Sequence, residues 1–298
     1  MVSSTGEQAA RVQCGWAGAP VTVLEPAVLS SAAVFSSPHS GRRYPDNFIQ
    51  RSRLDPLALR ASEDAFVDDL FRSAPDHGAP LVAAEFPRAF VDVNRADDEL
   101  DPALIAAASI RSRTLRVSAG LGVVPRVVSE GRPIYDGKLS MTEVQARIAA
   151  CHAPYHNAVT TALRRAKEAF GMGFLVDCHS MPSENARAGS RRAEIVVGDC
   201  YGVSCGADVS DTVVGLFRRA GFRVARNAPF AGGYLTHRYG RPRRGYHAVQ
   251  IEIDRGLYLD EARVEPLAGY HDFARALQPV IAGLAELPRT LGTALAAQ

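Results

Sequence analysis

The chain has 298 residues, of which 47% are hydrophobic and 22% charged, and its 34 basic and 32 acidic residues leave a formal net charge of +2. This nearly equal number of basic and acidic residues gives no general attraction to nucleic acid or to an anionic membrane surface, which argues against both as partners. No apolar run approaches the length of a membrane-spanning helix. Five cysteines without zinc-ribbon spacing favour reduced thiols and therefore a cytoplasmic location.

Residues 1–20 are rich in Ser, Gly, Ala and Gln and lack the basic start and apolar core of a signal peptide. They predict a flexible N-terminal arm. Residues 21–298 are expected to form a single α/β domain, because chains of this size often bury one large core.

Two histidines each follow an apolar run: His39 comes shortly after residues 32–35, and His179 after residues 174–176. Such runs predict buried strands, and open α/β sheets place their chemistry at the carboxyl ends of strands. One histidine in such a place is more often a surface or core residue. Two of them indicate a metal site, because neutral imidazole is the commonest nitrogen ligand of zinc and two leave room for a carboxylate and a water.

Ser62 predicts the N-cap of a helix that runs to Phe71, with Glu63 and Asp64 in its first turn, where the helix dipole favours anions. Neighbouring helical positions point about 100° apart, so Glu63 and Asp64 cannot both face a metal equally. Asp68, one turn after Asp64, is expected to be an outer or a surface acid.

The next strand is predicted at residues 81–84 and leads on to Asp92, Asn94 and Arg95. Arginine can hold a carboxylate through two hydrogen bonds at once. Arg95 is therefore either a ligand of an anionic substrate or a partner of Asp92 that fixes the loop, and the sequence leaves both interpretations open.

A capping box from Ser140 to Glu143 opens a long amphipathic stretch, which Pro154 is expected to kink or to divide into two helices. His152 and His156 lie one helical turn apart around this proline. That spacing could bind a metal on a continuous helix, but we expect none there, because the proline interrupts the helix and no glutamate follows His152. His156 is expected in the core or in a pocket wall.

Two polar segments follow His179. The loop over 182–192 comes directly after a strand end, as binding loops often do. The segment 227–245 is rich in glycine beside Tyr234 and Arg238, which suggests a loop that passes close to a ligand. The C-terminal residues 259–298 predict a helix against the sheet.

Glu252 lies inside the apolar run 248–254, where an apolar residue would be expected. A charged, unpaired glutamate in a buried strand costs on the order of several kcal/mol, so it needs a cation, a hydrogen-bond network or a raised pKa. A zinc site would meet that need.

From about Val34 to about Glu261, the chain resembles the N-formylglutamate amidohydrolase family. The blocks that carry the resemblance are residues 37–41, 86–95, 177–182, 227–234 and 250–258. Any one block would be weak evidence, whereas all of them in order are strong. The family looks like a branch of the zinc-dependent exopeptidase-like amidohydrolases. The resemblance therefore implies a three-layer α/β/α fold with a central mixed sheet, of the zinc-exopeptidase or phosphorylase/hydrolase-like kind.

The same resemblance implies one zinc ion (Zn2+) per chain, bound by His39, Asp64 and His179. Glu63 is the neighbour that could replace Asp64, or support it from outside. Glu252 is implied as the catalytic general base, which takes a proton from water and passes it to the leaving amine. Asp177 is expected behind His179, because a ligating histidine usually donates its other nitrogen to an acid or a carbonyl.

The implied substrate is a small anionic N-acyl amino acid, with N-formyl-L-glutamate, hydrolysed to formate and L-glutamate as in histidine degradation, as the first candidate. The residues expected to bind it are Arg95, Asn94, Ser40, Ser180, Tyr234 and Arg238. Two alternatives stay open: a hydrolase of another N-acyl amino acid or peptide-like amide, and a catalytically silent binding protein on the same fold. The presence of both histidines and Glu252 argues against a silent protein.

Overall fold

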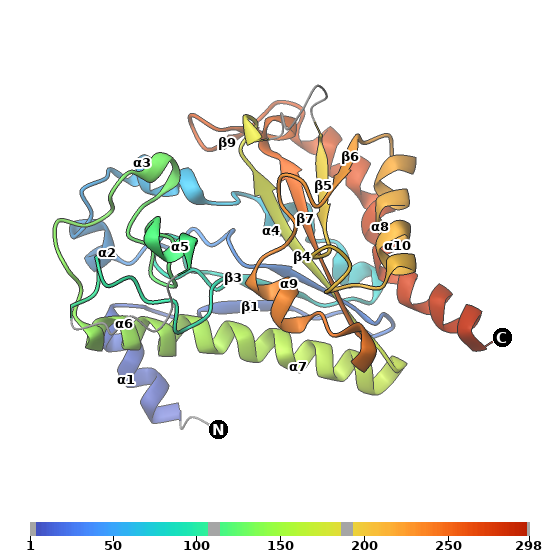
Figure 1. The fold of residues 1–298 in the computed structure, drawn as a ribbon, viewed down its shortest axis with the longest axis horizontal. Coiled ribbons are helices and arrows are strands. Elements are labelled where there is room, and N and C mark those ends of the chain that lie inside the picture. The colour runs from blue at the N-terminus through green and yellow to red at the C-terminus, as the bar shows by residue number, and fades with distance from the viewer. Residues whose placement is uncertain (1–3, 107–113, 186–192, 297–298) are drawn as a thin grey trace. The chain divides into compact units, whose positions relative to one another are not determined.

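The computed structural model describes residues 4–106, 114–185 and 193–296, and its centre is a seven-stranded sheet in the order β1-β3-β2-β4-β7-β5-β6 (Figure 1). Strands β2, β4 and β7 are parallel, whereas β5 is antiparallel to β7 and parallel to β6, so the sheet is mixed. The strands are β1 (Val21–Leu24), β2 (Ala33–Ser37), β3 (Leu81–Ala84), β4 (Gly173–Met181), β5 (Ile195–Gly198), β6 (Val224–Arg226) and β7 (Tyr246–Asp254), with a separate pair β8 (Leu259–Asp260) and β9 (Glu265–Pro266). The expected α/β fold with a central mixed sheet is confirmed.

Helices flank this sheet (Figure 1). The α-helices are α1 (Ser4–Cys14), α2 (Asp46–Gln50), α3 (Pro56–Leu59), α4 (Val67–Leu70), α5 (Leu115–Ser118), α6 (Met141–Arg147), α7 (Ala153–Phe170), α8 (Ala207–Arg219), α9 (Tyr234–Tyr239) and α10 (Tyr270–Ala296). Short turns of other helix types are η1 (Arg60–Ser62), η2 (Ala74–His77), η3 (Ser129–Gly131), η4 (Ile148–His152), η6 (Pro242–Arg244) and η7 (Arg255–Leu257). In the part of the chain that the structure describes, no helix is both long and apolar enough to cross a membrane.

The contacts divide the chain into two compact units. The first comprises Met1–Thr22, Pro38–Glu63 and Ala83–Ala158, and the second comprises Val23–Ser37, Asp64–Val82 and Val159–Gln298. The sequence led us to expect one domain over residues 21–298, and that organisation stays a prediction.

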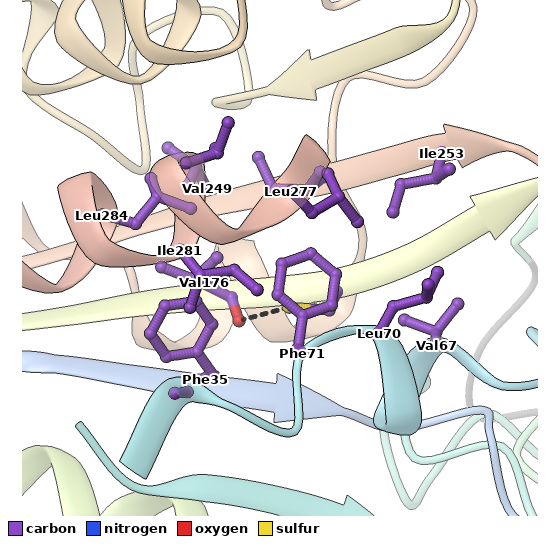
Figure 2. Packing of buried hydrophobic residues seen from close by; sticks show 14 of the residues in the cluster. Phe35, Val67, Leu70, Phe71, Val176, Val249, Ile253, Leu277, Ile281 and Leu284 are labelled. Atoms are coloured by element: carbon purple, nitrogen blue, oxygen red, sulfur yellow. Dashed lines mark hydrogen bonds between the residues drawn. The ribbon is translucent and has the colours of Figure 1, made fainter. Parts of the chain in front are cut away.

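The core of the second unit lies between the sheet and the C-terminal helix (Figure 2). Alternate residues of β4 and β7, such as Val176 and Val249, pack with Leu277 and Ile281 of α10. Because successive side chains of a strand point to opposite faces, the residues between them turn away from this core. This alternation leaves the other face of β4 and β7 for polar side chains. Of the helix expected over 259–298, α10 forms Tyr270–Ala296, whereas the residues before it include the strands β8 and β9.

The N-terminal residues differ from the flexible arm that we expected. Ser4–Cys14 form helix α1, and Cys14 and Trp16 are buried. The Trp16 ring lies 5.9 Å from the ring of Phe86, edge to face. Burial of these side chains gives the segment a fixed place that its polar composition does not indicate.

The stretch around Pro154 is divided into two α-helices, as one of our two expectations had it, but a π turn joins them. The helical stretch continues from α6 through the π turn η4 into α7, and Pro154 lies in the first turn of α7. A π turn closes its hydrogen bonds one residue further along the chain, and this change in the hydrogen-bond pattern accommodates a proline, which has no N–H to donate. His152 and His156 therefore stay on one face, with their ring centroids 4.3 Å apart.

Asp199, directly after β5, connects helix α8 with the end of strand β6 in the second unit. Its buried carboxylate accepts hydrogen bonds from Ser210 Oγ (2.6 Å), Arg226 Nη2 (2.5 Å) and Asn227 Nδ2 (2.8 Å), and from the backbone N–H of Gly202. Burial alone would raise the pKa of Asp199, but these hydrogen bonds lower it to about 2.

We expect the Asp199→Asn substitution to lower the free energy of unfolding at pH 7 by about 2 kcal/mol, because it removes hydrogen bonds to a charged acceptor. The folded pKa lies below the unfolded value of roughly 3.9, so the contribution is full above that value and is lost as the pH falls towards 2. Urea unfolding at pH 7 and pH 3 should show the gap between variant and wild type narrowing at the lower pH. The exposed Asp272→Asn is the matched control, and an equal gap at both pH values would contradict this account.

Candidate functional site

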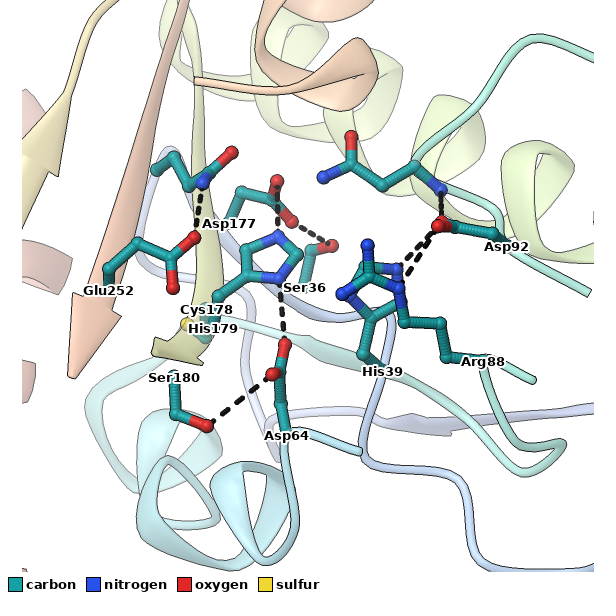
Figure 3. Close-up of polar contacts among 12 residues, drawn as sticks. Ser36, His39, Asp64, Arg88, Asp92, Asp177, Cys178, His179, Ser180 and Glu252 are labelled. Carbon is teal, nitrogen blue, oxygen red and sulfur yellow. Dashed lines mark hydrogen bonds and ion pairs between the residues drawn. The ribbon is translucent and has the colours of Figure 1, made fainter. Parts of the chain in front are cut away.

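Polar side chains line one face of β2, β4 and β7 near their carboxyl ends (Figure 3). In the register of these strands, Ser36 pairs with Asp177, and Asp177 with Gln250. Ser36 Oγ donates a hydrogen bond of 3.1 Å to Asp177 Oδ1. Two residues further along, His179 pairs with Glu252, so an imidazole and a carboxylate lie side by side on neighbouring strands.

His179 is held between two carboxylates of the second unit. Its Nε2 lies 2.9 Å from Asp177 Oδ2, and its Nδ1 lies 2.9 Å from Asp64 Oδ2. Burial alone would lower the pKa of His179, but the charges and hydrogen bonds of Asp177 and Asp64 raise it well above its usual value. The structure thus puts Asp177 behind His179, where it was expected.

Asp64 reaches His179 from a break in the backbone, and the predicted helix from Ser62 to Phe71 is wrong. The turn η1 ends at Ser62, Glu63 is extended, and Phe66 takes the left-handed conformation at φ 64° before α4 begins. Tyr258 donates a hydrogen bond of 3.0 Å from its hydroxyl to the carbonyl oxygen of Ala65, which holds this break in place. Glu63 and Asp64 therefore do not lie on one helix, and the expected angle of about 100° between their side chains does not apply.

Glu63 and Asp64 belong to different polar clusters. Glu63 accepts hydrogen bonds from Tyr44 (2.6 Å) and Arg60 (3.1 Å), and burial raises its pKa despite these partners. Asp64 accepts from Arg255 Nη2 at 3.1 Å and from Ser180 Oγ at 3.4 Å. The geometry therefore favours Asp64 over Glu63 as a metal ligand.

In the first unit, His39 has a carboxylate partner of its own. Its Nε2 lies 2.8 Å from Asp92 Oδ1, and the same carboxylate accepts from Arg88 Nε (3.0 Å) and from the backbone N–H of Asn94 (2.9 Å). Burial alone would raise the pKa of Asp92, but Arg88, Arg95 and His39 hold it well below its usual range. Asp92 thus orients His39 while it is itself charged.

The glycine after His39 and Ser40 is required by a close approach of the backbone. A Cβ at Gly41 would lie 2.0 Å from the carbonyl oxygen of Phe86, which is closer than any side chain can come. Both residues before it are buried. The sequence block around His39 is therefore fixed by packing as well as by chemistry.

His39, Asp64 and His179 form a buried cluster that could bind a metal. One ligand atom from each, two imidazole nitrogens and a carboxylate oxygen, lie within 4.8 Å of one another. Two nitrogens and one oxygen are a common donor set for divalent transition metals.

Glu252 is buried to 7% exposure in β7 and accepts a hydrogen bond of 2.5 Å from Gln250 Nε2. Its strand neighbour is His179. The carboxylate that disturbed the apolar pattern of this strand therefore lies next to a candidate metal ligand, as the pattern indicated.

The expected substrate-binding residues occupy several places, and their roles stay predictions. Arg95 donates from Nε to the carbonyl oxygen of Leu121 (2.9 Å) and from Nη1 to that of Asn94 (2.6 Å). Ser180 touches Asp64, as described above. In α9, Arg238 donates to the hydroxyl of Tyr234 at 2.6 Å. The glycine-rich segment over 227–245 thus includes helix α9 and turn η6, and of the expected loop over 182–192, residues 186–192 lie outside the described residues.

Three contributions were missed at the sequence level. Asp92 was considered only as a partner of Arg95, and the structure pairs it with His39. Arg255 follows β7 and donates from Nε to Ser180 Oγ (3.2 Å) as well as from Nη2 to Asp64. Gln250 supplies the donor to Glu252. Strand-end position was the available signal for Arg255, but no local pattern connects Asp92 to a residue 53 positions away.

A family model described as N-formylglutamate amidohydrolase matches residues 31–259. The chain belongs to the N-formylglutamate amidohydrolase family. It is 29% identical over 252 residues to an N-formylglutamate deformylase of Pseudomonas putida, a match that covers 83% of this chain and 88% of the relative. A deformylase of Pseudomonas aeruginosa is also 29% identical, over 85% of this chain and 91% of its own length.

A solved structure shares the fold. The crystal structure of an N-formylglutamate amidohydrolase from Ralstonia eutropha JMP134 matches with a TM-score of 0.86 and 36% sequence identity, over 92% of this chain and 99% of that chain. The resemblance inferred from the sequence blocks is therefore confirmed, and so is the fold that it implied.

Because Asp64 and not Glu63 joins the two histidines, we expect Asp64→Asn to weaken the binding of a divalent metal and Glu63→Gln to leave it nearly unchanged. Competition with a chelator, followed by metal analysis of the protein, measures both. Each substitution replaces one carboxylate oxygen by an amide NH2 group, so the two variants change the size of their side chains equally little. The reverse ranking would move the ligand role to Glu63.

Proposed function

We propose that this protein hydrolyses the amide bond of an N-formyl amino acid, with N-formyl-L-glutamate as its substrate and formate and L-glutamate as its products. The observation that carries the proposal is the buried cluster of His39, Asp64 and His179 with Glu252 beside His179 on the next strand. The names of the two Pseudomonas relatives support the choice of substrate. A cytoplasmic setting stays a prediction.

We further propose that the cluster holds one zinc ion per chain. Two histidines and one carboxylate are the protein ligands of many catalytic zinc sites. The charges of the second unit also favour a cation, because Asp64, Asp177 and Glu252 are three buried carboxyl groups, and Arg255 offers its guanidinium to Asp64. When bound, zinc would act as a Lewis acid and lower the pKa of a water molecule to near 7.

The carboxylates behind the two histidines would fix which nitrogen binds the metal. A carboxylate only accepts hydrogen bonds, so the Nε2 atoms of His39 and His179 carry the hydrogens that Asp92 and Asp177 receive. In a neutral ring, Nδ1 is then the nitrogen with a lone pair to offer, and for His179 this requires loss of the hydrogen that Nδ1 shares with Asp64.

Glu252 is proposed as the general base and acid. It would take a proton from the attacking water and deliver it to the nitrogen of the leaving amine, a role that requires a carboxylate within hydrogen-bond reach of both. Gln250 holds one of its oxygens through the 2.5 Å hydrogen bond, which orients the carboxylate. Arg255, buried beside Asp64, is our candidate for the charge that stabilises the carbonyl oxygen as it becomes negative.

Arg95 is proposed to hold the side-chain carboxylate of the substrate. Burial lowers its pKa, as do Arg88 and Arg116, while Asp92 opposes the shift, and the guanidinium remains a cation at neutral pH. Asn94, Ser40, Ser180, Tyr234 and Arg238 are proposed to shape the rest of the substrate pocket. If the enzyme preferred another N-acyl amino acid, these residues would contact different substrate groups, and the hydrolysis of the amide bond would proceed as described.

The Glu252→Gln variant tests the proposal. We expect formate release from N-formyl-L-glutamate to fall by roughly a hundredfold or more, because the amide keeps the shape and loses the proton acceptor. Zinc content and melting temperature should stay at the wild-type values, and the exposed Glu168→Gln should leave turnover unchanged.

Two results would count against this role for Glu252. Loss of zinc or a lower melting temperature would make it a ligand or a structural acid. Normal turnover with full zinc would pass the proton transfer to another acid, such as Asp177. Absence of formate release by the wild-type protein would refute the proposed function itself.

A further inference from the structure

His152 and His156 are buried to 5% and 6% exposure, and the chemistry proposed above uses neither of them. His152 is the last residue of the π turn η4, and His156 lies in the first turns of α7. Their spacing of four residues puts both on one helix face, and their rings are 4.3 Å apart. Two buried imidazoles packed together call for a reason, because each carries polar atoms away from water.

Both rings bond to the backbone of one short segment. His152 Nε2 lies 2.9 Å from the carbonyl oxygen of Arg95, and His156 Nε2 lies 3.0 Å from that of Val93. A carbonyl oxygen only accepts, so both Nε2 atoms donate. The two histidines therefore hold the peptide groups before and after the one that joins Asn94 to Arg95.

The middle peptide of this segment is held by Arg95 itself. Arg95 Nη1 donates 2.6 Å to the carbonyl oxygen of Asn94, and Nε donates 2.9 Å to that of Leu121. Three consecutive carbonyls, of Val93, Asn94 and Arg95, thus each accept a hydrogen bond from a side chain. Neither the backbone nor the guanidinium of Arg95 can turn without breaking one of these bonds.

The charge of Arg95 is only partly matched by this arrangement. Backbone carbonyls accept its hydrogen bonds but carry no net charge, and the nearest carboxylate oxygen, Asp92 Oδ2, lies 3.8 Å from Nη2, which is too far for a hydrogen bond. A carboxylate on a substrate would complete the pairing, since a guanidinium offers two parallel N–H groups to it.

We propose that His152 and His156 are positioning residues that give the enzyme its preference for a substrate with a side-chain carboxylate. They fix the segment from Val93 to Arg95 and thereby the direction of the Arg95 guanidinium. The proposal rests on the proposed function, because it assumes that Arg95 meets the substrate carboxylate. The proposal goes beyond that function by assigning the preference for a side-chain carboxylate to two residues that act through the backbone of Val93 and Arg95.

The test compares phenylalanine and glutamine at both positions. His152→Phe and His156→Phe keep a ring and remove the donor, whereas His152→Gln and His156→Gln keep an N–H near the position of Nε2. Steady-state formate release from N-formyl-L-glutamate and from N-formyl-L-glutamine gives the preference for the charged side chain. The exposed His271→Phe in α10 is the matched control.

We expect the phenylalanine variants to lose about tenfold of this preference, through a higher KM for N-formyl-L-glutamate with kcat nearly unchanged, as for a weakened ionic hydrogen bond. The glutamine variants should keep most of it. Should the phenylalanine variants fail to fold, asparagine replaces phenylalanine, because its shorter amide is as polar as glutamine but does not reach the carbonyls. An unchanged preference in variants that fold without the donor would overturn the proposal, and so would an equal loss in the glutamine variants.

Calorimetric titration with L-glutamate separates this proposal from the proposed function. Weaker L-glutamate binding in the variants without the donor, restored in the glutamine variants, supports the positioning role. This holds even if the wild-type protein releases no formate, a result that would refute only the proposed function. Full formate release together with unchanged preference and unchanged L-glutamate binding refutes only the positioning role. A wild-type protein that neither releases formate nor binds L-glutamate refutes both.

Discussion

The register of β4 against β7 is the constraint on which the candidate site depends. Because strand side chains alternate between faces, the pairing of His179 with Glu252 sends both to the polar face, while Val176 and Val249 go to the core against α10. A shift of one residue would turn His179 towards the apolar helix face and separate it from the glutamate. The hydrophobic core of the second unit therefore determines the chemistry on the opposite face, because it fixes which residues of each strand can be polar.

Buried carboxylates form the second constraint. A buried charge is costly unless it is paired, so each acid near the histidines needs partners. Asp92 has Arg88 and a backbone N–H besides His39, and Asp177 has Ser36 besides His179. The groups that orient the imidazoles are thus stabilised by contacts of their own, and the positions of the histidines follow from the fold around them.

Local patterns predicted the parts of the site that local sequence determines. The strands before His39 and His179 are continuous apolar runs, and Glu252 was visible as a conflict between an acid and its apolar neighbours. Such conflicts tend to mark functional positions. The sheet and the C-terminal helix followed from the same kind of periodicity.

The parts that were wrong depend on contacts between distant residues. The capping signal at Ser62 predicts a helix. In the structure, the left-handed conformation of Phe66 and the hydrogen bond from Tyr258 to the carbonyl oxygen of Ala65 interrupt that helix. The division of the helical stretch near Pro154 was predicted, but the π turn that keeps His152 and His156 on one face was not. Helical and turn signals alone could not indicate that His152 would hold the segment that ends at Arg95, because that contact spans 57 positions.

The central claim is that formate release requires a metal held by His39, Asp64 and His179. The most direct measurement is zinc content and formate release from N-formyl-L-glutamate before chelation, after removal of the metal, and after zinc is returned. The account predicts about one zinc per chain, loss of activity on chelation and recovery with zinc, with neither metal nor activity in His39→Ala and His179→Ala. Full activity in protein freed of metal would contradict it.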